Sequence, residues 1–145
     1  MKRKFLFITA IVVFLMVNVI TFSFENRFES SKAIASSMYG KSLCYEEALK
    51  LEKPIVVIFY ADWCGYCKRF APVEAQLQQE YSSKYTFVTV NADNPENKML
   101  LQKFNIKSYP SLYLVDPKAN KQKFVSQGIY TNKSKMETEF DNFLK

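Results

Sequence analysis

Two cysteines separated by two residues carry the clearest chemical signal in this sequence. Cys64 and Cys67 stand in the stretch YADWCGYCKRF, which follows the apolar run PIVVIF. A Cys-x-x-Cys pair can contribute to a metal site, close a structural disulfide or exchange electrons as a reversible dithiol. The other residues of the chain bear on which of these three chemistries applies.

Metal binding would require ligands that this sequence does not supply. A structural zinc site takes four Cys or His ligands, usually as two spaced pairs. The chain has no histidine, and its only other cysteine is Cys44. A zinc or copper site would therefore need dimerisation or help from carboxylates. We expect no metal and no other cofactor.

The spacing of Cys64 and Cys67 suits electron exchange better than a structural bridge. Such a bridge closes a very small loop, so it would constrain the unfolded chain little. If a helix begins at Cys64, the unpaired N–H groups and the helix dipole favour a thiolate there and lower its pKa. Cys67 then lies one turn into the helix. We therefore predict that Cys64 attacks a substrate disulfide and that Cys67 resolves the mixed disulfide.

The elements around the cysteines alternate between helix and strand. We expect a helix over LCYEEALKLE with Ser42 as its cap, and then a buried strand over IVVIFY. A helix should start at the cysteines and be kinked by Pro72. Cys44 falls in the first of these helices, where a partly apolar setting predicts a buried free thiol.

The second half of the chain continues the alternation. It predicts a strand over YTFVTVNA, a helix from Asn94-Pro95 to about Phe104, strands over SLYLV and QKFVSQ, and a last helix capped by Asn132. The apolar side of that last helix should consist of Met136, Phe140, Phe143 and Leu144. The order αβαβαββα indicates an α/β fold with parallel strands early and an antiparallel hairpin late.

Five features taken together resemble the thioredoxin-fold thiol–disulfide oxidoreductases. They are YADWCGYCK, Pro72 eight residues after Cys64, VNADNPE, SYPSLYLV, and Gly128 before the last helix. They cover residues 41–145 in the family's order and spacing. The resemblance implies a thioredoxin fold, with a central mixed four-stranded sheet flanked by helices, and thiol–disulfide oxidoreductase activity.

The resemblance also implies roles for individual residues. Cys64 resembles the attacking cysteine, and Cys67 resembles the resolving one. Trp63 matches the aromatic residue that flanks the family's active site, and Pro110 matches its cis-proline. We expect the residues that contact substrate to be Trp63, Gly65, Tyr66, Tyr109 and Pro110.

Two departures from the family pattern bear on chemistry. Ile58 and Thr89 occupy the places where thioredoxins carry a buried aspartate and a lysine. This puts thioredoxin-like proton transfer at the resolving cysteine in doubt, although water or Asp62 could substitute. Between the cysteines, Gly65-Tyr66 replaces Gly-Pro and is similar to periplasmic disulfide isomerases.

The amino-terminal segment predicts export. Lys2, Arg3 and Lys4 precede twenty uncharged residues at 5–24, long enough as a helix to cover a bilayer core of about 30 Å. We interpret residues 1–24 as a signal peptide or signal-anchor helix, 25–40 as a polar linker and 41–145 as the thioredoxin-like domain. With the basic residues on the cytoplasmic side, the domain faces the periplasm or another extracytoplasmic compartment.

Charge argues against nucleic acid as a partner. The formal net charge is +6, but three of these charges belong to Lys2, Arg3 and Lys4, and acids and bases intersperse in the rest. We expect a reductase or isomerase that acts on exported proteins with disulfides or thiols. A reductase in that compartment would also need a membrane electron-transfer partner. The alternative is a membrane-tethered binding or chaperone module whose disulfide does not cycle.

Overall fold

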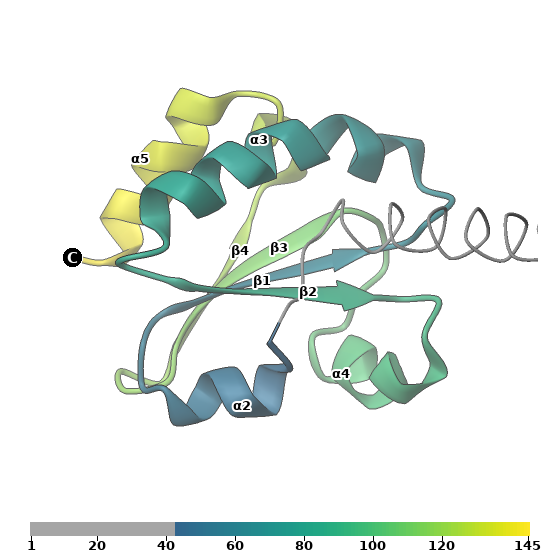
Figure 1. Cartoon of the computed structure of the whole chain (residues 1–145), viewed down its shortest axis with the longest axis horizontal. Helices are drawn as coiled ribbons and strands as arrows, with labels where there is room; N and C mark the ends of the chain where they lie inside the picture. The colour runs from purple at the N-terminus through teal and green to yellow at the C-terminus, as the bar shows by residue number, and fades with distance from the viewer. Residues whose placement is uncertain (1–42) are drawn as a thin grey trace, which may run out of the picture. The chain divides into compact units, whose positions relative to one another are not determined.

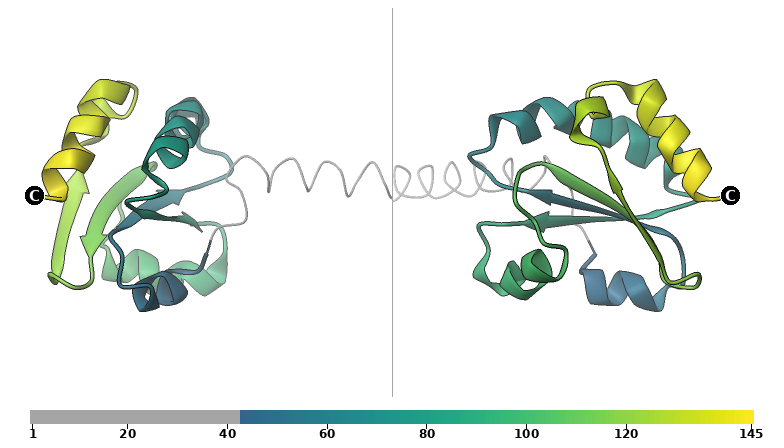
Figure 2. Two further views of the ribbon diagram at one scale, coloured as in Figure 1. Left: turned by 60° about the vertical axis from the view of Figure 1, so that its left-hand side comes forward. Right: turned by 180° about the vertical axis from the view of Figure 1, so that it is seen from behind.

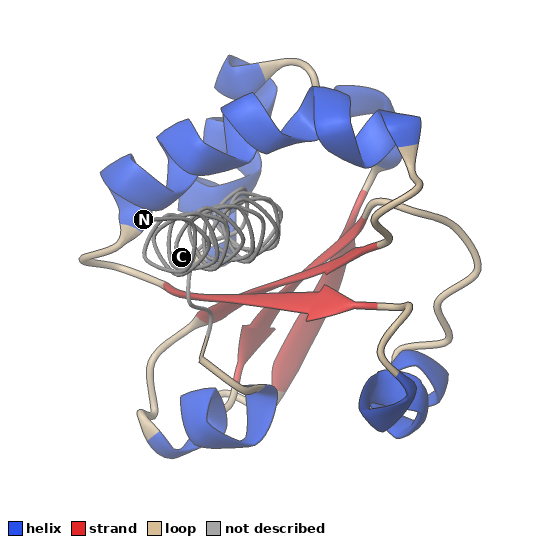
Figure 3. Ribbon diagram, turned by 45° about the vertical axis from the view of Figure 1, so that its right-hand side comes forward, coloured by secondary structure: helices blue, strands red, loops and turns tan. Residues whose placement is uncertain are grey.

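A four-stranded sheet with helices on both faces forms the part of the chain that the computed structural model describes, residues 43–145. Helices α3 and α5 cover one face, and α2 and α4 cover the other (Figures 1 and 3). The elements in order are α2 (Tyr45–Lys50), β1 (Ile55–Tyr60), α3 (Gly65–Tyr81), β2 (Thr86–Asn91), the 3-10 helix η1 (Pro95–Asn97), α4 (Lys98–Lys103), β3 (Ser111–Asp116), β4 (Lys121–Val125), the 3-10 helix η2 (Gln127–Ile129) and α5 (Lys133–Phe143).

The strands follow the order β2-β1-β3-β4, as Figure 2 also shows from two further sides. β1 pairs with β2 in parallel and with β3 antiparallel, and β3 and β4 form an antiparallel hairpin. Val57, in the middle of β1, lies opposite Val88 on β2 and Tyr113 on β3. The predicted order of elements and the mixed sheet are therefore confirmed.

The central strand β1 separates two apolar cores. Successive side chains of a strand point to opposite faces. Val56 and Ile58 pack with the side chains of α3 and α5, whereas Ile55, Val57 and Phe59 pack with those of α2 and α4. Burial on both faces explains why this strand reads as an uninterrupted apolar run.

The first described helix differs from the sequence prediction at its start. α2 begins at Tyr45, and its N-cap residue is Cys44 in an extended conformation with no side-chain cap hydrogen bond. The prediction of Ser42 as the cap is therefore wrong. The prediction of a buried thiol at Cys44 is also wrong, because Cys44 precedes the helix instead of lying on its apolar side, and it is exposed.

The predicted helix at 94–104 is confirmed, but it forms in two parts. The Oδ1 atom of Asn94 accepts the N–H of Glu96 at 3.0 Å, and Pro95 occupies the first position, as expected for a capped start. The first turn is the 3-10 helix η1, and α4 follows it. This helix ends beside the loop that leads into β3.

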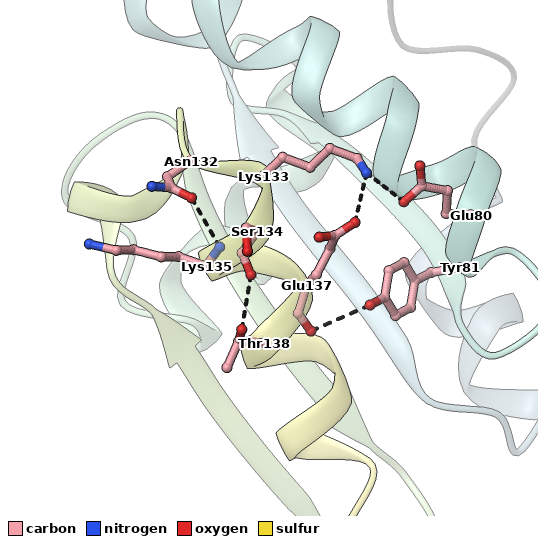
Figure 4. Close-up of polar contacts among 8 residues, drawn as sticks. All are labelled: Glu80, Tyr81, Asn132, Lys133, Ser134, Lys135, Glu137 and Thr138. Carbon is pink, nitrogen blue, oxygen red and sulfur yellow. Dashed lines mark hydrogen bonds and ion pairs between the residues drawn. The ribbon is translucent and has the colours of Figure 1, made fainter.

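The last helix is capped as predicted and is tied to α3 by polar contacts (Figure 4). Asn132 Oδ1 accepts the N–H of Lys135 at 3.1 Å. Lys133 Nζ lies 2.9 Å from Glu80 of α3 and 2.6 Å from Glu137 of its own helix. The apolar side consists of the buried side chains of Met136, Phe140 and Phe143. Leu144 was expected there too, but it is the exposed C-cap residue beyond the last turn.

The predicted amino-terminal segment and linker lie outside the described residues. Within residues 43–145, no helix is long and apolar enough to cross a membrane.

The fourth strand is shorter than its predicted range, since Ser126 and Gln127 leave β4 and lead into η2. That connection brings Gln127 and Gly128 close to the cysteine end of the sheet.

Candidate active site

The two cysteines lie at the amino-terminal end of α3, as the spacing predicts. Cys64 is the N-cap residue, in an extended conformation, and Gly65 begins the helix. The sulfur of Cys64 accepts the backbone N–H of Cys67 at 3.2 Å. An N-cap side chain in this position satisfies one of the N–H groups that a helix leaves unpaired at its start. A thiolate at Cys64 would receive the same N–H and the favourable end of the helix dipole.

The two thiols are unequal in exposure. No disulfide joins them; Cys64 is 5% exposed, and Cys67 is 1% exposed. Burial raises the pKa of the Cys67 thiol to about 12, and its hydrogen bond with Cys64 adds to the shift. Cys67 therefore keeps its proton near neutral pH, and Cys64 is the slightly more exposed of the two residues. The roles of attacking and resolving cysteine stay predictions.

The loop before β3 lies directly against Cys64. The Tyr109–Pro110 peptide bond is cis, as the family resemblance implies. The Cys64 thiol donates to the carbonyl oxygen of Tyr109 at 3.4 Å. Pro110 is buried, whereas Tyr109 is half-buried and packs against the cysteine pair. Tyr109 thus adjoins the Cys64 sulfur, and Pro110 follows it through the cis bond.

Trp63 is held at the surface by a network that the sequence analysis missed. Its side chain is 70% exposed, and its Nε1 donates to Asp93 Oδ1 at 3.0 Å. Asp93 Oδ2 accepts the N–H of Asp62 at 3.0 Å, and Asp62 Oδ2 accepts from Asn91 Nδ2 at 3.0 Å. Asp93 belongs to the VNADNPE stretch, which is part of the family resemblance, but the resemblance assigns no role to Asp93.

The residues between the cysteines face solvent. Tyr66 is 69% exposed, and the guanidinium of Arg69 lies 4.2 Å from the centre of its ring. A Cβ atom added to Gly65 would meet nothing within 4 Å, so the fold itself does not demand a glycine there. Arg69 is a second residue that the sequence analysis did not single out.

A groove of about 430 Å³ extends from Tyr66 along the loops at the end of the sheet. Its lining includes Tyr66, Arg69, Tyr109, Gln127, Gly128 and Tyr130. Gln127 Nε2 donates to Ser108 Oγ at 2.8 Å and to Pro110 O at 2.7 Å, which links the connection after β4 to the loop before β3. The predicted site residues Tyr66, Tyr109 and Pro110 line this groove, and Trp63 and Gly65 are not among its lining residues.

The structure holds a buried acid, but not where thioredoxins carry theirs. Ile58 and Thr89 lie opposite each other in the sheet, and Ile58 is buried. Glu74, seven residues after Cys67 on α3, is 4% exposed, and its Oε2 atom has no hydrogen-bond partner. Burial raises the pKa of Glu74 to about 8. Glu74 lies two turns after Cys67, on the helix face that also buries Phe70 and Leu77. This helical spacing is the sequence signal that could have predicted its burial.

Across residues 43–145, no three His, Cys, Asp or Glu side chains come together in a way that could hold a metal ion. What this end of the sheet provides is a sulfur at a helix start, a second sulfur behind it, and a loop and groove beside them. Those parts suit attack by a thiolate on a disulfide in an extended partner segment.

Comparison with known proteins supports this description. Residues 38–141 match the family model described as Thioredoxin. The chain is 40% identical over 83 residues to "Thioredoxin-like protein HCF164, chloroplastic" of Arabidopsis thaliana, covering 57% of this chain and 32% of that protein. It is 29% identical over 120 residues to "Thiol:disulfide interchange protein TxlA" of Synechococcus elongatus, covering 83% and 61%. The chain thus spans about a third of the length of the HCF164 proteins of Arabidopsis thaliana and Oryza sativa.

Shorter relatives and solved structures agree. "Thioredoxin" of Rickettsia bellii is 32% identical over 104 residues, which cover 72% of this chain and 94% of that protein. The solution structure of a thioredoxin from Thermus thermophilus superposes with a TM-score of 0.60 at 19% identity, over 73% of this chain and 88% of that one, and supports the fold. The chain belongs to the thioredoxin family of thiol–disulfide oxidoreductases.

Proposed function

We propose that this protein exchanges its Cys64/Cys67 dithiol with disulfides in exported proteins. The observation that carries the proposal is the position of the Cys64 sulfur, which caps α3 and accepts the N–H of Cys67 at 3.2 Å. The thiolate is the nucleophile in thiol–disulfide exchange, and a helix start stabilises it. Cys67 is buried one turn later, and in this proposal it reacts second.

The exchange runs in two steps. The Cys64 thiolate attacks one sulfur of a substrate disulfide; a Cys64–substrate disulfide forms, and the other substrate sulfur leaves as a thiolate. Cys67 then gives up its proton and attacks the Cys64 sulfur, which releases the second substrate sulfur as a thiolate. The substrate gains two electrons, and the protein is left with a Cys64–Cys67 disulfide. A dithiol from a separate donor must reduce that disulfide before the next turnover.

The neighbouring residues would hold the substrate during attack. Trp63 and Tyr66 flank Cys64 and present exposed aromatic surface, and Gly65 leaves the backbone between the cysteines uncovered. The Tyr109 carbonyl now accepts from the Cys64 thiol. Once that sulfur is a thiolate or part of a mixed disulfide, the carbonyl can accept an N–H of the partner chain, with Pro110 fixing the loop behind it.

Direction and location extend the proposal. The relative TxlA is named a thiol:disulfide interchange protein, and HCF164 is named chloroplastic. We favour a reductase or isomerase, because the Trp-Cys-Gly-x-Cys sequence resembles that branch of the family. The apolar stretch at 5–24 after three basic residues supports export to a periplasmic or other extracytoplasmic location, through a signal peptide or a signal-anchor helix. A reductase there needs a membrane electron-transfer partner.

Insulin reduction by the full-length protein in detergent tests the proposal. With dithiothreitol as the electron donor, we expect the wild-type protein to accelerate insulin precipitation, and the Cys64→Ser and Cys67→Ser variants to stay near the uncatalysed rate. Wild-type turnover no faster than the variants would favour the alternative, a tethered binding or chaperone module whose disulfide does not cycle.

The Cys67→Ser variant also identifies substrates. Without a resolving thiol, the mixed disulfide at Cys64 should accumulate, so partners can be isolated from cells and released by reduction. Their redox state in cells lacking the protein then gives the direction of electron flow.

A further inference from the structure

The end of the sheet that carries the cysteines is ordered from one side to the other by the strand order. β1, β2 and β4 run in the same direction, and β3 runs in the opposite direction. The segments that follow β1, β2 and β4 and the segment that precedes β3 therefore meet at one end of the sheet. In the order β2-β1-β3-β4, these segments carry Asp93, Cys64, Pro110 and Gln127 in turn. Cys64 therefore lies between the Asp93 side and the side of the groove.

The Asp93 side of Cys64 is acidic. Asp62 and Asp93 are both exposed, and they accept hydrogen bonds from backbone, indole and amide N–H groups. No ion pair among residues 43–145 involves either carboxylate. Two negative charges on this side of Cys64 would repel an acidic residue of a partner that lies there.

The groove side has the opposite charge. Arg69 is the one charged residue among those that line the groove, and no ion pair in the described part of the chain involves it. Its guanidinium stacks on the Tyr66 ring at 4.2 Å. A stacked guanidinium keeps its N–H donors at its edge, where they can bind a carboxylate with two hydrogen bonds.

The floor of the groove is held together by a ring stack and by hydrogen bonds. Phe70 of α3 and Tyr130 are stacked with ring centres 4.9 Å apart. The Tyr130 hydroxyl accepts the N–H of Leu112 at 2.8 Å and donates to the carbonyl of Val125 at 2.9 Å. At the rim of the groove, a Cβ atom added to Gly128 would meet only Ser126 Oγ, at 3.8 Å, so the fold does not require a glycine there. Because Gly128 has no side chain, it leaves this part of the groove open.

We propose that this groove selects partner segments that carry an acidic side chain beside the reacting cysteine, with Arg69 as the residue that recognises the carboxylate. The inference rests on the proposed exchange at Cys64 and adds the substrate class to it. An extended segment bonded to Cys64 lies across the acidic side and the groove side at once. Its acidic residue is attracted by Arg69 on one side and repelled by Asp62 and Asp93 on the other.

Disulfide-linked peptide dimers that differ at one position test this inference on the reduced full-length protein. The variable residue is Glu, Gln or Lys; in one set it precedes the cysteine, and in the other it follows it. The measurement is the second-order rate of peptide thiol release at low ionic strength. We expect the Glu peptide to react about threefold faster than the Lys peptide in one of the two sets, the size typical of an exposed ion pair.

Variants of Arg69 and of its neighbour Lys68 separate recognition of the carboxylate by Arg69 from an effect of net charge. Arg69→Glu should invert the preference, and Arg69→Gln should bring the rates together. Lys68→Glu makes the same change in net charge at an exposed neighbour outside the groove lining, and should keep the preference of the wild-type protein. The preference should also shrink in 0.5 M salt, because exposed charges are screened.

The outcomes are distinguishable. Equal rates for Glu and Lys peptides in both sets, or an equal inversion by Lys68→Glu, overturn the role of Arg69 and leave the exchange activity standing. Release of thiol from none of the peptides overturns the proposed exchange and this inference with it.

Discussion

α3 has a buried polar group at two places, and the two groups differ in their hydrogen-bond partners. At the amino-terminal turn, the Cys64 sulfur accepts the N–H of Cys67 and donates to Tyr109 O. Two turns beyond Cys67, Glu74 is buried as deeply, yet its Oε2 atom has no hydrogen-bond partner. The buried sulfur of Cys64 thus has two hydrogen-bond partners, whereas burial without a partner at Oε2 disfavours a charge on Glu74. Polar groups that α3 buries to a similar depth therefore differ in their hydrogen-bond partners.

The largest effect that this comparison predicts is on the reactivity of Cys67. Its pKa of about 12 leaves a thiolate fraction near 10⁻⁴ at pH 8, so we expect alkylation about 10³-fold slower than for an ordinary free cysteine. Exposed Cys44 is a control within the same molecule. Iodoacetamide labelling of the reduced protein, followed by mass spectrometry of each cysteine peptide over pH 7–10, measures both rates. Equal labelling of Cys67 and Cys44 would contradict the burial of the resolving thiol.

Glu74 should lower the stability of the protein as pH rises. The pKa of its carboxyl is about 8 in the folded protein against 4.5 ordinarily, so between these values the unfolded chain loses the proton while the folded one keeps it. Stability is therefore greatest below pH 4.5 and falls as pH rises toward 8, by on the order of 4 kcal/mol.

Glu74→Leu removes this cost and sharpens the comparison. We expect the variant to gain about 1 kcal/mol over the wild type at pH 4, where a neutral, poorly paired carboxyl is lost, and several kcal/mol at pH 9. Glu74→Gln, which does not titrate, should flatten the pH dependence with a smaller gain. Urea unfolding at pH 4, 7 and 9 gives the free energies. A Glu74→Leu variant with the same pH dependence as the wild type would show that Glu74 is not the titrating group.

The sequence was sufficient where local patterns decide the structure. The helix start at Cys64, the Asn94 and Asn132 caps and the apolar strand at 55–60 each depend on residues within one turn or one strand. The cis bond before Pro110 was reached through the family resemblance, since an isolated proline does not specify it.

The features that the sequence did not reveal depend on contacts between distant segments or on element boundaries. Asp93 meets Trp63 across 30 residues, because β2 ends beside β1. Cys44 was placed on a helix that begins one residue later. Glu74 looks like any helical glutamate until α3 is packed on the sheet, where its face is the buried one. Boundaries and the depth of burial are set by tertiary packing, which local patterns do not encode.

Tyr130 offers the smallest of these effects and the converse of Glu74. Its buried hydroxyl, beneath Phe70 of α3, has both its acceptor and its donor capacity used, by Leu112 N–H and by Val125 O. Tyr130→Phe keeps the stacked ring but leaves two buried backbone groups unpaired, so it should cost about 1–3 kcal/mol of unfolding free energy. Unlike the Glu74 effect, this loss should be the same at pH 4 and pH 8, because burial raises the pKa of Tyr130 and keeps its hydroxyl protonated throughout. Urea unfolding at both pH values tests this. A Tyr130→Phe variant with the unfolding free energy of the wild type would mean that the hydrogen-bonded hydroxyl adds no stability. The contrast with Glu74 would then come from charge and not from hydrogen-bond partners.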